Sequence, residues 1–146
     1  MALSIRIKLF DVDLPLPAYQ TAGAAGFDLY ARRRVTIGPG RTAKVPLNVA
    51  LELPPGYWLL LAARSSLHTK GLMLANGVGV GDEDFRGDND EYLAVLTNLF
   101  DRPATVGRGE RIVQGIILPR QRAKLERVEQ LGLTDRGGLG STGRRA

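Results

Sequence analysis

Short apolar runs with a two-residue period dominate this chain and restrict it to a β-rich fold. Ile5, Ile7 and Leu9 alternate with polar residues, and the same alternation continues through residues 45–53. Because successive side chains of a strand point to opposite faces, this pattern predicts half-buried strands. Pro46 lies inside the second run and cannot donate a ladder hydrogen bond, so we expect an edge position or a bulge there.

Further apolar segments extend the predicted β structure. They cover residues 57–62, 92–99 and 112–118. Glycine- and proline-rich turns separate the strands at residues 38–40, 54–56, 101–103 and 107–109. Only residues 65–70 favour a helical turn. Many short strands between such turns indicate an all-β sandwich or barrel.

Composition narrows the class of protein. The 146 residues fit a single domain, and the absence of cysteine excludes a disulfide framework and thiolate chemistry. His68 is the only histidine, and we interpret it as a surface or cap residue because one histidine without cysteines cannot form a zinc site. The net charge of +5 favours anionic partners. The scattered basic residues and 6% aromatic content argue against a nucleic-acid groove.

The sequence also indicates the cellular location of the protein and the character of its last residues. No apolar run approaches the ~20 residues that a membrane span requires, and the start of the chain lacks the features of a signal peptide. We therefore expect a cytoplasmic protein with no membrane partner. Residues 134–146 are glycine-rich, polar and basic, which predicts a flexible arm after a single β domain of residues 1–133.

Two segments have the composition of anion or metal sites. Asp28 follows a glycine-rich stretch and offers hard oxygen ligands suited to Mg²⁺ or its bound waters, although it could equally cap a turn that leads into a strand. Arg64, Ser65 and Ser66 combine a guanidinium with two hydroxyls, which suits a phosphate. Either serine could instead cap the helical turn.

A third segment, residues 76–87, combines alternating glycines with carboxylates. It predicts a tight hairpin whose bare backbone groups could pair with the edge of a planar base. Asp82 follows as a candidate general base that activates water, and Phe85 offers a flat apolar face for a sugar. The alternative is an acidic, solvated loop.

Two last segments contain further polar candidates. Gln114 could donate a hydrogen bond to a phosphate or satisfy a buried strand. Residues 136–143 suit a flexible lid over phosphates, but they do not form a P-loop because no Gly-Lys-Ser/Thr follows a strand.

Taken in order, these five segments resemble the five motifs of the trimeric dUTPase family, from Gly23 to Gly143. The resemblance implies a jelly-roll-like β subunit in a homotrimer, with active sites shared at the interfaces and closed by a neighbour's arm. It also implies hydrolysis of dUTP to dUMP and pyrophosphate with Mg²⁺ as cofactor.

The resemblance also implies a role for each matching residue. Asp82 activates the attacking water, Asp28 is linked to Mg²⁺ through water, and Phe85 packs on the deoxyribose. The other substrate contacts are Asn76, Gly79 and Val80 for uracil, Arg64, Ser65, Ser66 and Gln114 for the phosphates, and Arg136, Leu139, Gly140, Ser141 and Thr142 in the arm.

The chain departs from the family pattern in several places. Gly81 stands where a bulky aliphatic residue is usual, and residues 88–90 form an insertion. Leu139 replaces a stacking aromatic residue, Ser66 replaces a glycine, and Arg136 is displaced by two residues. Two alternatives follow: a dCTP deaminase-related enzyme, or a catalytically weak nucleotide-binding regulatory protein of the same fold.

Overall fold

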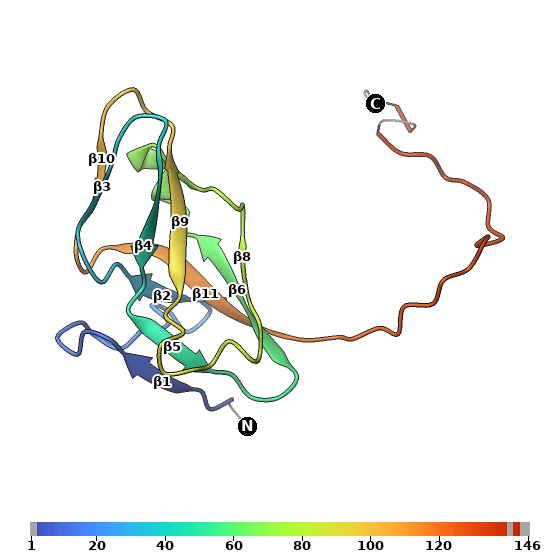
Figure 1. Cartoon of the computed structure of the whole chain (residues 1–146), viewed down its shortest axis with the longest axis horizontal. Helices are drawn as coiled ribbons and strands as arrows, with labels where there is room; N and C mark the ends of the chain where they lie inside the picture. Colours follow the sequence, from blue (N-terminus) through green and yellow to red (C-terminus); the bar gives the residue numbers. More distant parts are fainter. Residues whose placement is uncertain (1–2, 140–141, 144–146) are drawn as a thin grey trace.

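The computed structural model describes residues 3–139 and 142–143 and is almost entirely β-structured, as the sequence predicted (Figure 1). The strands are β1 (Arg6–Leu9), β2 (Phe27–Tyr30), β3 (Val35–Ile37), β4 (Thr42–Pro46), β5 (Val49–Glu52), β6 (Tyr57–Ala63), β7 (Leu72–Leu74), β8 (Gly79–Gly81), β9 (Leu93–Asn98), β10 (Ala104–Val106) and β11 (Arg111–Pro119). The described residues contain a single 3₁₀ turn, η1 (Leu67–Lys70), which lies within the helical turn predicted at residues 65–70. None of the described residues forms a helix of the length and apolarity needed to cross a membrane.

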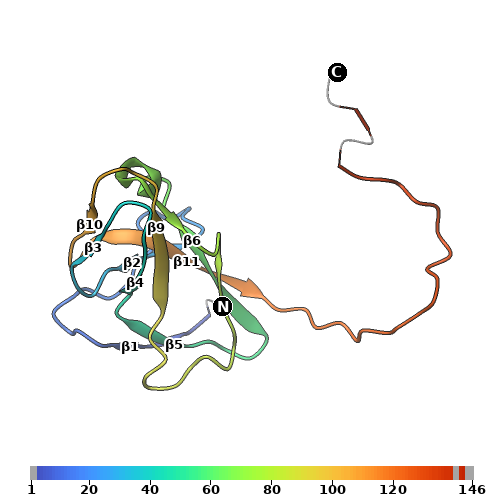
Figure 2. The same cartoon turned by 45° about the horizontal axis from the view of Figure 1, so that its top comes forward.

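The strands form two main sheets and two smaller pairs. One main sheet has the order β2-β11-β6-β8 and the other the order β4-β9-β7, while β1 pairs with β5 and β3 with β10. All these pairings are antiparallel. Figures 1 and 2 show β9 passing across β11, so the two main sheets form the layers of a sandwich.

Alternating residues of the facing strands fill the core between the layers. Leu59 and Leu61 of β6 are buried, as are Ala94 and Leu96 of β9. Each large apolar side chain buried in this way contributes about 1.5–3 kcal/mol relative to an exposed one. Burial in β6 thus alternates with the two-residue period of a strand, although its sequence is apolar on both faces.

The alternating run 45–53 forms two strands, not the one that its period suggested. β4 ends at Pro46, and β5 begins at Val49 in a different sheet. Between them Asn48 adopts φ 70°, and its side-chain amide donates to the Asp11 carbonyl at 3.0 Å. The side chain thus takes over hydrogen bonding that a continuous strand would supply. The edge position expected for Pro46 is confirmed, since β4 borders its sheet.

The hairpin predicted over residues 76–87 is also different in detail. The turn forms at Gly77, with φ 71°, but β7 before it pairs with β9 whereas β8 after it pairs with β6. The left-handed glycine carries the chain from one sheet to the other. The two strands around the turn are consequently not partners of each other.

The chain leaves the sandwich at the end of β11. The Arg120 amide donates to the Gly56 carbonyl at 2.7 Å, and residues 120–139 are exposed and outside any strand or helix. Figure 1 shows this segment running away from the body of the molecule. The division proposed at residues 133 and 134 stays a prediction, although the last strand already ends at Pro119.

Candidate active site

A pocket of about 240 Å³ is bounded by β8 and by the chain that precedes and follows it. Its lining residues are Leu61, Asn76, Gly79, Val80, Gly81, Phe85, Glu91, Tyr92 and Leu93. Four of the residues assigned to the nucleoside, Asn76, Gly79, Val80 and Phe85, are therefore brought together. We call this space the nucleoside pocket.

The backbone of β8 forms one wall of the nucleoside pocket. β8 pairs with β6 along one edge, with Gly79 opposite Leu61 and Gly81 opposite Leu59. No strand of the described chain pairs with its other edge. An edge strand presents a row of backbone donors and acceptors, and two glycines leave that row uncovered by side chains. This wall can therefore bind a planar, hydrogen-bonding edge.

Two aromatic rings support the pocket beside β8. The rings of Phe85 and Tyr92 meet edge to face with centroids 5.1 Å apart. A Cβ atom on Gly81 would overlap the Tyr92 hydroxyl and would lie 2.6 Å from its Cε1 atom, so the ring occupies the space of a side chain at position 81. Burial raises the pKa of Tyr92 to about 12, with the nearby charges of Asp82 and Asp90 adding to the shift. The phenol is therefore neutral at ordinary pH.

Asp82 directly follows β8 and opens the turn that ends at Phe85. The Phe85 amide donates to the Asp82 carbonyl at 3.1 Å, and the Asp82 side chain is exposed. The next residue anchors this turn, because Glu83 accepts from the Gly56 amide at 2.8 Å and from Arg120 at 2.6 Å. The Gly56 hydrogen bond, followed by the charge of Arg120, holds the pKa of Glu83 below its usual value.

A second cluster surrounds Asp28 on β2. Arg64 Nε lies 3.0 Å from one carboxylate oxygen of Asp28, and Arg111 Nη1 lies 3.1 Å from the other. Arg64 also donates to the Arg111 carbonyl at 3.2 Å. Asp28 itself is buried, with 6% of its surface exposed. The buried carboxylate thus holds two guanidinium groups in fixed positions.

Gln114 lies opposite Asp28 across the β2–β11 pair, so both side chains are on the same face of the sheet. Its amide donates to the Ala63 carbonyl at 3.2 Å. A Cβ atom on Gly26 would lie 3.0 Å from the Gln114 Oε1 atom, which explains the glycine at this position. The structure therefore groups Asp28, Arg64 and Gln114.

A larger pocket of about 510 Å³ opens beside this cluster. Its lining residues are Arg64, Ser66, Leu67, Thr69, Lys70, Gly109, Glu110, Arg111 and Ile112. Its three cationic side chains outnumber the two carboxylates that pair with them, Glu110 with Lys70 and Asp28 with both arginines. The excess of donors and positive charge suits a phosphorylated ligand. We call this space the phosphate pocket.

The two serines lie at the mouth of the phosphate pocket and are exposed. Ser66 occupies the N-cap position of η1, but its side chain makes no capping hydrogen bond. The turn is instead held by Thr69, whose hydroxyl donates to the Ser66 carbonyl at 2.7 Å, and by His68, which contacts the Ser65 carbonyl at 2.8 Å. The prediction that His68 is an exposed residue of this turn is confirmed.

Arg111 is the member of the cluster that sequence reasoning missed. Strict alternation along β11 would place Arg111 and Gln114 on opposite faces. The ladder with β2 shifts register between Arg111 and Val113, and this irregularity brings both side chains to Asp28. The presence of an arginine three residues before Gln114 is the one sequence signal for the contact between Arg111 and Asp28.

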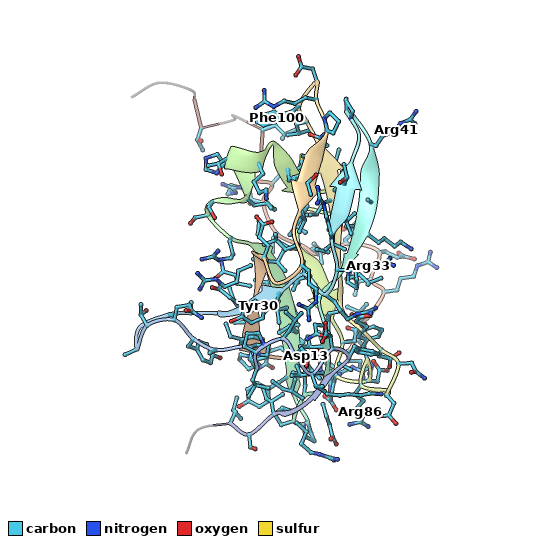
Figure 3. All side chains as sticks on the ribbon, turned by 90° about the vertical axis from the view of Figure 1, so that its left-hand side faces the viewer. Asp13, Tyr30, Arg33, Arg41, Arg86 and Phe100 are labelled. Atoms are coloured by element: carbon cyan, nitrogen blue, oxygen red, sulfur yellow. The ribbon has the colours of Figure 1, made fainter. Side chains whose placement is uncertain are left out.

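The two pockets occupy separate parts of the subunit and share no lining residue. Gly81, just before Asp82, pairs with Leu59, five residues before Arg64. Five strand residues span roughly 16 Å. In Figure 3, Arg86, next to Phe85, lies at the lower end of the molecule, and Phe100, which packs against Gly71 after η1, lies at the upper end.

The described residues of the arm line neither pocket. Arg136, Leu139 and Thr142 are exposed, and Leu139 adopts φ 49°. Gly140 and Ser141 lie outside the described residues. The contacts assigned to the arm therefore stay predictions.

No protein-only metal site is present in residues 3–139 and 142–143: no three histidine or acidic side chains converge there. Both oxygens of Asp28 face guanidinium groups. Mg²⁺ typically keeps several waters and takes its other ligands from substrate phosphates and one or two carboxylates. This arrangement fits an ion that arrives with the nucleotide and contacts Asp28 through water.

Comparisons with known proteins identify the family. The sequence model of the dUTPase family matches residues 13–143. A deoxyuridine 5'-triphosphate nucleotidohydrolase of Caldanaerobacter subterraneus subsp. tengcongensis is 41% identical over 98% of this chain and 99% of its own length. A protein of the same name from Anaeromyxobacter sp. is 46% identical over 90% of this chain and 89% of its own.

Solved structures agree with these matches. The dUTPase of Streptococcus mutans superposes with a TM-score of 0.73 at 35% identity, covering 81% of this chain and 98% of that one. The dUTPase of Staphylococcus bacteriophage 80alpha, determined with dUPNHPP, gives a TM-score of 0.84 over 97% of this chain and 99% of its own, and at 23% identity it supports the fold alone. The chain belongs to the dUTPase family.

Proposed function

We propose that the protein hydrolyses dUTP to dUMP and pyrophosphate. The observation that carries this proposal is the nucleoside pocket along the uncovered edge of β8, with Asp82 directly at its end. Uracil presents a carbonyl, an N–H and a second carbonyl along one edge, which matches alternating backbone donors and acceptors. Phe85 would pack on the sugar. Relatives named deoxyuridine 5'-triphosphate nucleotidohydrolase support the same substrate.

Asp82 is the base of the proposed reaction. Its carboxylate accepts a proton from a water molecule as that water attacks the α-phosphorus. The bond between the α-phosphorus and the bridging oxygen to the β-phosphorus breaks, and pyrophosphate leaves. The side chain of Asp82, which directly follows the pocket residue Gly81, is exposed, and this supports the role because the attacking water must come from solvent.

Arg64, Arg111 and Gln114 would hold the phosphates. Because Asp28 already fixes both arginines, little reorganisation is needed when the charge of the triphosphate arrives. Mg²⁺ bound to the phosphates would neutralise part of their charge. In this proposal Asp28 orients water around that ion.

We further propose that the active sites form between subunits of a homotrimer. The roughly 16 Å of strand between the levels of Asp82 and Arg64 is too long for both groups to reach one phosphate within a chain, since each needs hydrogen-bond distance. A neighbouring subunit can bring its phosphate pocket to the nucleoside pocket. Four apolar side chains of the exposed segment between β11 and the arm, Leu125, Val128, Leu131 and Leu133, suit docking on another subunit. The cytoplasmic location stays a prediction.

The test is pyrophosphate release with Mg²⁺ from a panel of dUTP, dCTP, dTTP and UTP. We expect dUTP to be hydrolysed fastest. Asp82→Asn should lower turnover by about 10²–10⁴-fold, the usual contribution of a general base, while the variant still binds a non-hydrolysable dUTP analogue. Asp84→Asn is the matched control, because it removes a carboxylate from the same exposed turn. Full turnover in Asp82→Asn would overturn the mechanism.

The same assay separates the two alternatives raised by the sequence. Release of ammonia from dCTP would indicate a deaminase. Tight binding of dUTP without any pyrophosphate release would indicate a regulatory protein. Either result would contradict the proposed hydrolysis.

A further inference from the structure

A buried hydroxyl group beside the nucleoside pocket has no partner. Tyr92 is 6% exposed, and its Oη atom has no hydrogen-bond partner among the described residues. Nearly all buried polar groups in proteins are paired, because an unpaired one loses its interaction with water without compensation. The exception therefore needs an explanation in terms of function or of another state of the site.

The position of this hydroxyl limits what it can bind. It is shielded from solvent, so a nucleotide in the pocket cannot reach it directly. It lies against Gly81, whose lack of a side chain makes room for it. The next residue along the chain is Asp82, and its charge contributes to the raised pKa of Tyr92. We therefore take its partner to be a protein group that moves, and Asp82 directly follows Gly81, the residue against which the hydroxyl lies.

The other acid near the phenol is already engaged. Asp90 also acts on the pKa of Tyr92, but its carboxylate accepts a hydrogen bond from the Gly87 amide at 2.6 Å. The Tyr92 backbone is fixed on both sides, since its amide donates to Val49 at 3.0 Å and its carbonyl accepts from Leu47 at 2.9 Å. The position of Tyr92 is consequently fixed, whereas the exposed Asp82 side chain can change its rotamer.

We propose that Tyr92 is a positioning residue, whose ring fixes Phe85 and Gly81 and whose hydroxyl donates a hydrogen bond to the Asp82 carboxylate when nucleotide fills the pocket. The bond would aim the carboxylate at the attacking water. This inference rests on the proposed function. Tyr92 lies directly before β9. It would support Asp82 in place of a side chain at position 81, which is a glycine in this chain.

The test is Tyr92→Phe, which keeps the ring and removes only the hydroxyl. We expect kcat for dUTP to fall by about tenfold or more, the usual effect of losing a hydrogen bond to a charged group, with KM nearly unchanged. Tyr19→Phe is the matched control: Tyr19 also meets a phenylalanine edge to face, Phe27 at 5.6 Å, but it is 53% exposed and outside the nucleoside pocket. It should leave kcat unchanged.

Thermal unfolding of the same variants completes the test. If Tyr92 only fills space, removing an unpaired buried hydroxyl should raise the unfolding midpoint and leave kcat at the wild-type value, and this result would overturn the inference. Pyrophosphate release by the wild-type chain is measured first. If the wild type releases none from dUTP, the proposed function fails and this inference fails with it. Wild-type turnover with an unaffected Tyr92→Phe variant overturns this inference alone.

Discussion

The two pockets of this subunit are built in opposite ways. In the phosphate pocket the charged side chains already satisfy one another, since Asp28 is paired with both Arg64 and Arg111. In the nucleoside pocket the binding groups are backbone atoms on the edge of β8, and the one buried hydroxyl, on Tyr92, has no partner in the described chain. One half is complete before any ligand arrives, and the other has groups still to be satisfied.

Under the proposed function, this difference follows from what each half would bind. A triphosphate carries a large charge, and fixed guanidinium groups stabilise it without reorganisation. The buried charge is that of Asp28, and the two part-exposed arginines are its partners in the absence of substrate. A base is recognised by shape and by a few neutral hydrogen bonds, which exposed glycine backbone can supply. We therefore expect substitutions in the two pockets to affect activity and stability differently.

The largest expected effect comes from placing the defects of the two pockets on different subunits. Arg64→Gln and Asp82→Asn subunits should each be nearly inactive alone, because each lacks one half of the site. Unfolded together and refolded as mixed trimers, they should recover up to about a quarter of wild-type pyrophosphate release, since each half of a shared site is intact with a probability of one in two. Recovery is measured at a 1:1 ratio.

Two controls make this experiment decisive. Each variant refolded alone shows the background, and light scattering of the mixture gives the oligomeric state. If mixed trimers form and no activity returns, both halves of each site come from one chain. The proposal of sites shared between subunits would then be wrong.

The next largest effect concerns the phosphate pocket alone. Arg111→Met should lower kcat/KM for dUTP by roughly tenfold to a hundredfold, the cost of a lost charged hydrogen bond. Asp28 keeps Arg64 as a partner, so the fold should persist. Arg108→Met is the matched control, because Arg108 pairs with Asp11 at 2.7 Å outside the pocket. Equal loss in both variants would contradict a specific role for Arg111.

The sequence was a good guide to the elements and to the nucleoside half. The period-two runs located β1, β4 and β5, and the apolar segments located β6, β9 and β11, since burial determines both patterns. The glycine-rich motif located β8 and Asp82, because backbone recognition requires glycine at fixed positions. The phosphate half was only partly predictable: the register shift in β11 that brings Arg111 to Asp28 depends on pairing with β2, a strand more than eighty residues away.

Long-range pairing also explains the other differences. The run 45–53 keeps one period through two strands, so its division at Asn48 depends on hydrogen bonds that Asn48 accepts from the Asp11 amide and donates to the Glu91 carboxylate. The partners of β7 and β8 likewise lie elsewhere in the chain. Local sequence patterns carry no signal for such partners. They specify strands, whereas tertiary contacts specify sheets.

The smallest expected effect sharpens the account of the nucleoside half. Gly81→Ile restores the aliphatic side chain usual in the family, but its Cβ would overlap the Tyr92 ring. We expect a loss of about 1–3 kcal/mol in the free energy of unfolding, the cost of overpacking. Tyr92→Leu alone should cost about 2–4 kcal/mol by leaving a cavity. The double variant should lose less than the sum of the two single losses, because the space left by the Tyr92 ring can take part of the new side chain.

Urea unfolding at one protein concentration measures this cycle, since subunit association contributes to apparent stability. Gly81→Ile combined with Tyr19→Leu is the control, because Tyr19 does not contact position 81 and the two losses should add. Additive losses in the Gly81 and Tyr92 pair would show that the two positions do not share one space. Recovery in the double variant without recovery of kcat would separate the packing of the Tyr92 ring from the work of its hydroxyl. The structure would then account for both the glycine and the tyrosine at these positions.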